Sequence, residues 1–278
     1  MSSKEQRLGP SATSHFDRRS ATYDQGEIHH NVVALLIAGA EIRTGFRVLD
    51  IATGTGLLAI EAAQKVGPAG KVLGIDVSKG MLAEARRKAA AAQLRNIDFV
   101  LSDAERLEFP PDSFDCVFCS SALVSMSDIP RALRHWIDFL KPGGTIAFDA
   151  PSKPFGIAQV IADIAAEHGV HLTYSDIADT PNKCCSLLKE AGFEVVAIRT
   201  ELANTNPIEL SEAIAFWDTR LDHPAWRALK EAQSTTREAM RSEYVERVTV
   251  AAVAGYVPND TALNFVFGRK PATHTWGL

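Results

Sequence analysis

From Phe46 onward, short apolar runs alternate with segments of helical periodicity, and this alternation most constrains what the chain can fold into. The first five runs are FRVLDIA, KVLGIDV, NIDFVLS, FDCVFCS and TIAFDAP. Between them lie helical segments that include GLLAIEAAQKV, SKGMLAEARRKAAAAQL and SDIPRALRHWIDFL. Strands that alternate with helices indicate βαβ units and a parallel sheet. A helix–strand unit, PNKCCSLLKEAGFEVVAIRTEL, and a last strand, TALNFVFGRK, bring the expected sheet to seven strands.

The fold class that this pattern predicts is a doubly wound, Rossmann-like α/β domain with a mostly parallel sheet. We expect the domain to span residues 45–270, after a polar and then helical arm at 1–44 and before a tail at 271–278. Insertions at about 152–179 and 203–259 do not follow the strand pattern. Within the second insertion, apolar residues at helical spacing favour a surface helix packed on the core over a ligand wall.

Composition narrows the classes of function. The 278 residues carry a formal net charge of −5, and hydrophobic residues make up 46% of the chain. A chain without a basic surplus is not expected to bind nucleic acid. The first residues, MSSKEQRLGP, lack the apolar run of a signal peptide, and no stretch has the length of a membrane span. The default expectation is a cytoplasmic protein with reduced thiols; whether it forms a homodimer stays open.

Cys116 and Cys119 form a C-x-x-C pattern, but they lie within one expected strand. Side chains three residues apart on a strand point to opposite faces of the sheet. We therefore expect structural cysteines and not a metal or redox pair.

The first apolar run leads into a glycine-bearing loop, in the sequence VLDIATGTG of residues 48–56. Glycines let the backbone turn tightly beside a ligand, and the following helix offers free N–H groups. On its own the loop fits a dinucleotide too, because Gly54, Gly56 and Ala59 satisfy that pattern. Asp50 discriminates between the ligands: a carboxylate there repels a pyrophosphate and suits the cationic ammonium of S-adenosylmethionine.

Two further acidic residues end the next two strands. Asp76 follows Gly56 at a spacing where a carboxylate can accept both ribose hydroxyl protons. The competing interpretation of Asp76 is a helix N-cap, although Ser78 could fill that position. Asp103 can accept from an adenine amino group, or it can serve as a turn residue.

Together these motifs closely resemble the class I methyltransferases, especially the ubiquinone and menaquinone biosynthesis group. The resemblance runs from about Phe16 to Glu201 and includes VLDIATGTG, GIDVSKGML, SDAERLEFPPDSFD, LRHWIDFLKPGG and LLKEAGF. The segment FDRRSATYD at residues 16–24 is similar to the family's F-D-x-x-A-x-x-Y-D. This chain departs from the family pattern at Ser20, where alanine is usual, and at Ala52, where many members have glycine.

The resemblance implies S-adenosyl-L-methionine as the cofactor and a set of residues that hold it. Asp50 and the glycine loop would hold its methionine end, Asp76 the ribose, and Tyr23 would close over the methyl group. The full set is Tyr23, Asp50, Ala52, Thr53, Gly54, Gly56, Asp76, Val77, Met81, Asp103, Ala104 and Ser120. The arm and the two insertions would then form a lid over the site.

The N-terminal arm also contains candidates for a general base, for an acceptor that must lose a proton. Tyr23, Asp24, His29 and His30 are close together in sequence, and a histidine can act as a base near neutral pH while a carboxylate orients it. A solvated helix start is the competing interpretation. The rival bases are His168, His171 and His223, and we find no sequence cluster typical of a metal site.

The acceptor is expected to be a small molecule. Aromatic residues in the insertions predict an apolar or aromatic acceptor pocket: Phe155, Tyr174, Phe216, Trp217, Trp226 and Tyr244. The predicted function is transfer of a methyl group from S-adenosylmethionine to such a metabolite. Two alternatives stay open, an NAD(P)-binding oxidoreductase and a cofactor-binding protein that does not methylate.

Overall fold

A seven-stranded sheet forms the centre of the protein in the computed structural model, which describes residues 10–172, 177–221 and 226–272. The strand order is β3-β2-β1-β4-β5-β9-β6. Strands β1 to β5 pair in parallel, whereas β9 runs antiparallel to both of its neighbours. The strands are β1 (Arg47–Ile51), β2 (Lys71–Asp76), β3 (Ile97–Leu101), β4 (Phe114–Cys119), β5 (Leu140–Phe155), β6 (Glu194–Asn204) and β9 (Thr261–Arg269). The predicted doubly wound, mostly parallel sheet is therefore confirmed.

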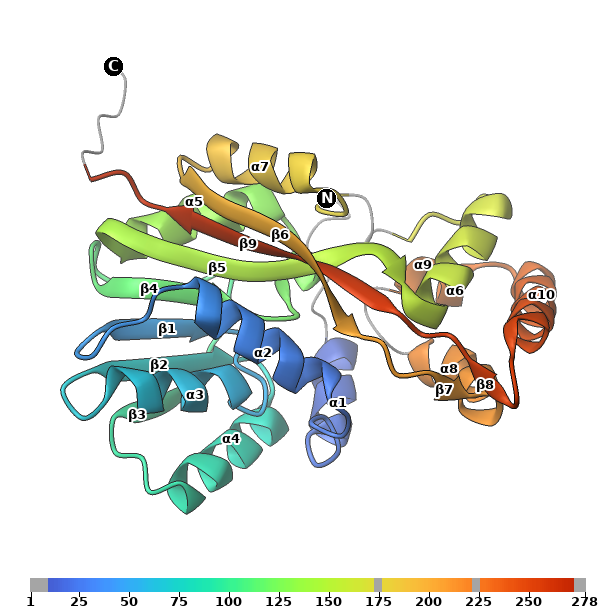
Figure 1. Ribbon diagram of the computed structural model, residues 1–278, viewed down its shortest axis with the longest axis horizontal. Helices are drawn as coiled ribbons and strands as arrows, with labels where there is room; N and C mark the ends of the chain where they lie inside the picture. Colours follow the sequence, from blue (N-terminus) through green and yellow to red (C-terminus); the bar gives the residue numbers. More distant parts are fainter. Residues whose placement is uncertain (1–9, 173–176, 222–225, 273–278) are drawn as a thin grey trace.

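Helices cover both faces of this sheet (Figure 1). Buried residues of α2 (Ile28–Gly39) and α3 (Leu57–Val66) pack on one face, and those of α5 (Ile129–Phe139) and α7 (Pro181–Glu190) pack on the other. Helix α4 (Lys79–Ala91) lies beside β2 and β3, and α1 (Pro10–Arg19) lies against α4. Strands β1, β4 and β9 are central and buried almost throughout, which explains why their sequences read as continuous apolar runs, whereas the edge strands β3 and β6 are partly exposed.

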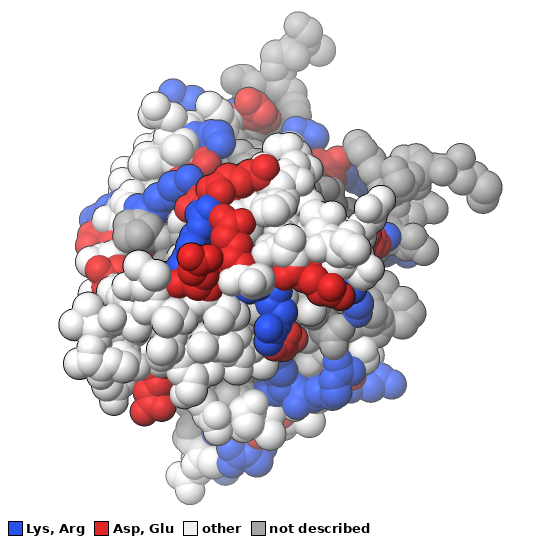
Figure 2. Space-filling model, turned by 90° about the vertical axis from the view of Figure 1, so that its right-hand side faces the viewer, with Lys and Arg blue, Asp and Glu red and all other residues white. Residues whose placement is uncertain are grey.

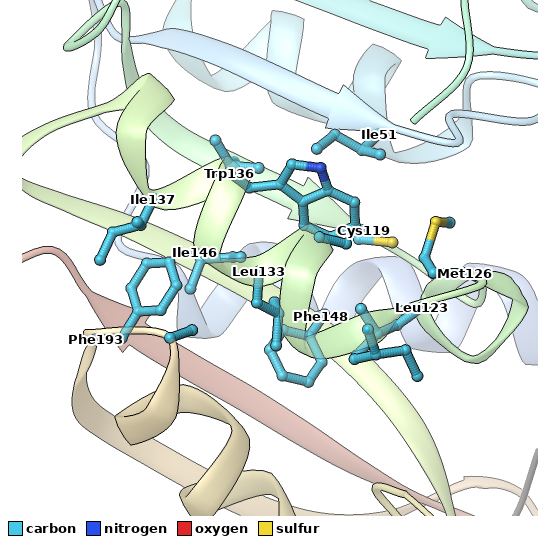
Figure 3. Packing of buried hydrophobic residues seen from close by; sticks show 14 of the residues in the cluster. Ile51, Cys119, Leu123, Met126, Leu133, Trp136, Ile137, Ile146, Phe148 and Phe193 are labelled. Carbon is cyan, nitrogen blue, oxygen red and sulfur yellow. The ribbon is translucent and has the colours of Figure 1, made fainter. Parts of the chain in front are cut away.

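The core on the α5 face is centred on Trp136, which is fully buried (Figure 3). Its ring lies against Ile51 and Cys119, and its Nε1 donates a hydrogen bond to the carbonyl of Ala104 at 3.1 Å. Ala104 follows β3, so a core side chain also fixes the loop at that strand's carboxyl end.

The two C-x-x-C cysteines lie on opposite sides of the sheet. Cys119 belongs to the α5-side core, and Cys116 belongs to the α2-side core. Both are free and fully buried, and burial raises the pKa of both thiols. The expectation of structural cysteines is consistent with this placement.

Strand β5 begins earlier than the sequence suggests. Helix α5 ends at Phe139 and the strand starts at Leu140, before the run Lys141-Pro142-Gly143-Gly144. Leu140 pairs with Phe114, and the register shifts before Cys116 pairs with Thr145. A bulge with Gly143 at a φ of +79° accommodates the extra residues.

A separate helical unit lies at the end of the sheet where β5 leads into α6 (Figure 1). It consists of α6 (Gly156–Glu167), α8 (Leu210–Arg220), α9 (Arg227–Glu231), α10 (Ser234–Ala251) and the short pair β7 (Ile208–Glu209) and β8 (Tyr256–Val257). These elements bury a core of their own, which includes Ala213, Trp217 and Tyr244. Helix α8 therefore packs as the surface helix that its spacing favoured.

Charged side chains of both signs lie next to one another on the outer face of this unit (Figure 2). Arg241 pairs with Asp218 at 2.8 Å and joins α10 to α8, and Arg247 pairs with Glu167 at 2.5 Å and joins α10 to α6. These pairs cross-link the helices. None of the described helices combines the length and the apolar character needed to cross a bilayer.

Candidate active site

The glycine loop follows β1 and turns sharply into α3. Ala52, Gly54 and Gly56 all have positive φ, at +55°, +55° and +79°. A β-carbon on Gly56 would lie 2.9 Å from the β-carbon of Ala85 and 3.1 Å from the ring of Phe99. Gly56 is thus needed for conformation and for close packing of the loop against α4 and β3.

Asp50 ends β1 as a buried carboxylate beneath this loop. It is 1% exposed, and its Oδ2 accepts a 2.6 Å hydrogen bond from Thr53 Oγ1. Its Oδ1 forms no hydrogen bond of normal geometry with the described residues, although the amide of Ala59 in the first turn of α3 also favours the ionised form. Burial, together with the charge of Asp76, raises the pKa of Asp50 to about 7. A cation beside Oδ1 would satisfy this group.

Asp76 ends β2 and holds two loops together. Its Oδ2 accepts from the Gly54 amide at 2.9 Å, and its Oδ1 accepts from the Ser78 amide at 2.8 Å. Burial raises the pKa of Asp76, and these amides act in the opposite direction. Ser78, and not Asp76, is the N-cap of α4, because its Oγ accepts from the Met81 amide at 3.1 Å. The carboxylate therefore faces the cavity at the junction of both loops.

Two acidic residues attach the N-terminal arm to these loops. Asp17 accepts from Ser78 Oγ at 2.5 Å and from the Gly80 amide at 2.8 Å. Asp24 accepts from Thr55 Oγ1 at 2.5 Å and from Lys88 Nζ at 2.6 Å. Both oxygens of Asp24 thus tie the arm to the glycine loop and to α4, which is a different contact from the orientation of His29 expected from the sequence.

The arm and the strand ends enclose a cavity of about 280 Å³. A smaller one of about 40 Å³ adjoins the glycine loop. Of the predicted cofactor residues, those that line the larger cavity are Tyr23, Ala52, Gly54, Asp76, Val77, Met81, Ala104 and Ser120. The smaller one is lined by Asp50 and Thr53, and it shares Tyr23, Ala52, Gly54 and Ser120. Gly56 and Asp103 line neither cavity; the Asp103 carboxylate accepts from the Glu105 amide.

A known family covers this site. The family described as "Methyltransferase domain" matches residues 48–144, which include the glycine loop, Asp76 and the β4 edge. Aklanonic acid methyltransferase DauC of Streptomyces sp. (strain C5) is 43% identical over 141 residues, which cover 50% of this chain and 64% of that protein. Demethylmenaquinone methyltransferase of Symbiobacterium thermophilum is 41% identical over 43% of this chain and 48% of its own length.

Residues 48–144 are thus similar to a methyltransferase domain, and the chain spans between about half and about two thirds of the length of these two relatives. A weaker match extends this likeness beyond the domain: nocamycin O-methyltransferase of Saccharothrix syringae is 28% identical over 94% of this chain and 99% of its own length. Among solved structures, a methyltransferase from Bacillus halodurans superimposes with a TM-score of 0.60 at 20% identity, over 86% of this chain and 98% of that one. The [4+2]-cyclase SpnF has the same fold, with a TM-score of 0.56 at 21% identity over 87% and 80% of the two chains.

The site also contains residues that sequence reasoning missed. Asp149 on β5 is 4% exposed, and its Oδ1 accepts from the Ser121 amide at 2.7 Å. Burial raises the pKa of Asp149 to about 6. Ser121 has a φ of +54° and lines both cavities, so the buried carboxylate holds a loop that shapes the site. The sequence gives no signal for this contact, because Asp149 is on β5 and Ser121 is in the loop after β4, 28 residues earlier.

The arm supplies the aromatic wall of the cavity, and the insertions do not. Phe16 and the stacked rings of Tyr23 and His29, whose centroids are 4.6 Å apart, line the larger cavity. The expectation of an acceptor pocket built from insertion aromatics is therefore wrong for the described ones, which pack within the helical unit and line neither cavity: Phe155, Phe216, Trp217, Trp226 and Tyr244. Tyr174 lies outside the described residues.

The candidate histidines also differ in whether they line the cavity. His29 is half-buried in the cavity wall, whereas His168 pairs with Glu243 on the helical unit at 3.0 Å. His171 is exposed and lines neither cavity, and His223 lies outside the described residues. Among the described residues, no three or more His, Cys, Asp or Glu side chains are grouped to hold a metal ion.

Proposed function

We propose that this protein transfers the methyl group of S-adenosylmethionine to a small metabolite. The observation that carries the proposal is the pair of buried strand-end carboxylates, Asp50 and Asp76, on either side of the glycine loop in a methyltransferase domain. Asp50 suits an ammonium group and Asp76 suits ribose hydroxyls. When bound, the cofactor supplies an electrophilic methyl group on a sulfonium, which needs alignment with the nucleophile and exclusion of water more than activation.

We assign the remaining cofactor contacts from the cavity wall. Tyr23, Ala52, Thr53 and Gly54 would surround the methionine end, since they line the smaller cavity beside Asp50. Met81 and Ala104 would contact the adenosine, and Val77 and Ser120 would contribute backbone and hydroxyl contacts. Asp103 and Gly56 would act indirectly, through the shape of the loops that carry them.

The N-terminal arm is the proposed cover of the site. Hydrogen bonds from Thr55 to Asp24 and from Ser78 to Asp17 join it to the cofactor loops, so ligand binding there is expected to order the arm. The insertion at 203–259 contributes no described residue to either cavity, and any part it plays as a lid would need movement. Hydrogen exchange on addition of S-adenosylhomocysteine should slow in residues 16–30; slowing confined to the glycine loop would contradict the arm as a cover.

For an acceptor that must lose a proton, His29 is the proposed base. It lines the cavity, it is half-buried, and its ring stacks on Tyr23, which limits its orientation. Asp24 would hold the arm in place and not the imidazole, because its oxygens are bonded to Thr55 and Lys88. The aromatic wall favours a planar or apolar acceptor. Relatives named for aklanonic acid, nocamycin and demethylmenaquinone support a small-molecule acceptor.

Calorimetry with S-adenosylhomocysteine tests the cofactor assignment. Asp76→Ala is expected to weaken binding by about 1–3 kcal/mol, because it removes charge-assisted hydrogen bonds. Asp98→Ala is the matched control, since Asp98 is an exposed carboxylate on the neighbouring strand β3 and lines neither cavity. Binding of NADH with no binding of S-adenosylhomocysteine would favour the oxidoreductase alternative.

A second candidate function deserves a direct test, because the fold is shared with a protein named as a cyclase. A cell extract incubated with the protein and methyl-labelled S-adenosylmethionine is expected to yield a labelled small molecule by mass spectrometry. Cofactor binding without any labelled product would favour a protein that uses the cofactor as a scaffold.

A further inference from the structure

Arg19 places a positive charge in the wall of the larger cavity. It is the last residue of α1 and is half-buried, and it lines the cavity together with Phe16 and Tyr23. Its guanidinium carbon lies 5.4 Å from the centroid of the Tyr23 ring. Since Tyr23 also stacks on His29, the guanidinium is held beside a rigid pair of rings.

Three carboxylates of the arm and the cavity wall have partners other than Arg19. Asp17 bonds Ser78 and Gly80, Asp24 bonds Lys88 and Thr55, and Asp76 accepts two amides. Among the described residues, Arg19 forms no ion pair. A guanidinium presents five N–H donors in a planar fork that fits a carboxylate in a bidentate geometry.

We propose that Arg19 binds an anionic group of the methyl acceptor, so that the acceptor is a planar small molecule with a carboxylate or a similarly acidic oxygen. This inference rests on the proposed function, because it assumes that an acceptor shares the cavity with the cofactor. The Tyr23–His29 pair supplies the apolar wall for the planar part, and Arg19 fixes the end of the molecule that carries the charge. Arg19 is thus a specificity-determining residue.

The cofactor has a carboxylate of its own, and its position argues against the same partner. The methionine end is assigned to the smaller cavity, beside Asp50 and the glycine loop. Arg19 lines the larger cavity and not the smaller one. The guanidinium is therefore better placed for a second molecule.

Calorimetry on the full chain saturated with S-adenosylhomocysteine tests the proposal with two probes of equal shape, 2-naphthoate and 2-naphthamide. We expect naphthoate to bind about 10- to 100-fold more tightly than the neutral amide, as for a charge-assisted pair. Arg19→Met keeps an unbranched, flexible side chain without the charge and should remove this preference, whereas Arg19→Lys keeps the charge and should retain part of it. Arg18→Met is the matched control, because Arg18 is exposed on the same helix and lines neither cavity.

Three results would overturn the proposal. Equal binding of both probes to the unaltered protein, or binding of neither at millimolar concentration, would show that the cavity does not select an anion. An Arg19→Met variant that loses affinity for S-adenosylhomocysteine but not for 5′-methylthioadenosine, which lacks the carboxylate, would assign the guanidinium to the cofactor. Failure of the proposed function itself is distinct: the unaltered protein would then not bind S-adenosylhomocysteine at all.

Discussion

The sheet and the helical unit are both built around large buried side chains, but they differ in where their polar groups lie. Asp50, Asp76 and Ser120 lie at or next to the carboxyl ends of β1, β2 and β4, and they line the cavities. In the helical unit the buried polar group is turned inward: the Tyr244 hydroxyl donates to the carbonyl of Ala213 at 2.5 Å. Buried aromatic residues in the helical unit therefore form a core, and their burial does not indicate a ligand site.

The largest expected effect comes from comparing His29 in the cavity wall with His168 in the helical unit. His29→Ala is expected to lower kcat about 10²- to 10⁴-fold if the acceptor needs a base, with cofactor affinity nearly unchanged. The pH–rate profile would also lose an ionisation near neutrality. His168→Ala is the matched change in the helical unit and should leave kcat as it is, because His168 pairs with Glu243 outside the cavities. A lower kcat in His168→Ala with an unchanged kcat in His29→Ala would indicate that the catalytic base lies in the helical unit.

Two buried tryptophans test whether the regions are coupled. Trp136→Ala and Trp217→Ala should each lower the free energy of unfolding by about 3–5 kcal/mol, because both rings are fully buried. Only Trp136→Ala should also weaken S-adenosylhomocysteine binding, because Trp136 bonds the carbonyl of Ala104 in the cavity wall. Thermal unfolding and calorimetry measure the two effects.

Trp217→Phe provides a milder variant in case the alanine change prevents folding. Loss of cofactor affinity in Trp217→Phe would mean that the helical unit supports the cofactor site after all.

The sequence predicts the sheet and its cofactor loops better than the helical unit and the contacts between distant segments. The sheet was predictable because segments with strand periodicity alternate with segments of helical periodicity. The loop at residues 52–56 was predictable because its glycines and the nearby Asp50 indicate a ligand-binding turn from the local sequence alone. The aromatic stripe of α8 could not be assigned a site from sequence, since core and ligand walls use the same residues. The contacts of Asp24 with Lys88 and of Asp149 with Ser121 join distant segments, and no local pattern encodes them.

Asp50 is expected to lower the stability of the ligand-free protein when it is ionised, and to favour ligand binding in the same state. Its folded pKa of about 7 is above the usual value, so the folded state retains a proton that the unfolded state releases. Stability from this group is therefore full below the ordinary aspartate pKa of 3.8, and it is lost as the pH rises from there through about 7. Asp50→Asn should make the ligand-free protein about 1–3 kcal/mol more stable than the unaltered protein at pH 8, and should weaken S-adenosylhomocysteine binding.

Thermal unfolding from pH 5 to pH 8 measures this difference. Asp163→Asn on α6 is the control in the helical unit, because it is exposed and lines neither cavity. An Asp50→Asn protein that is less stable than the unaltered one at pH 8 would mean that the ionised carboxylate is compensated in the folded state.

Two alanines with left-handed backbones give the smallest and most closely matched comparison. Ala52 in the glycine loop and Ala254 beside β8 have φ of +55° and +51°. A residue with a β-carbon is strained there by about 1–2 kcal/mol, and glycine removes this strain but loses about 0.4–1 kcal/mol through the greater entropy of the unfolded chain. Ala52→Gly and Ala254→Gly should therefore each raise the free energy of unfolding by about 0–1.6 kcal/mol in thermal melts. Since Ala52 lines both cavities and Ala254 lines neither, only Ala52→Gly should change the affinity for S-adenosylhomocysteine. A change in affinity from Ala254→Gly would connect the helical unit to the site, and a loss of stability above 1 kcal/mol from Ala52→Gly would mean that the alanine side chain stabilises the loop through its packing.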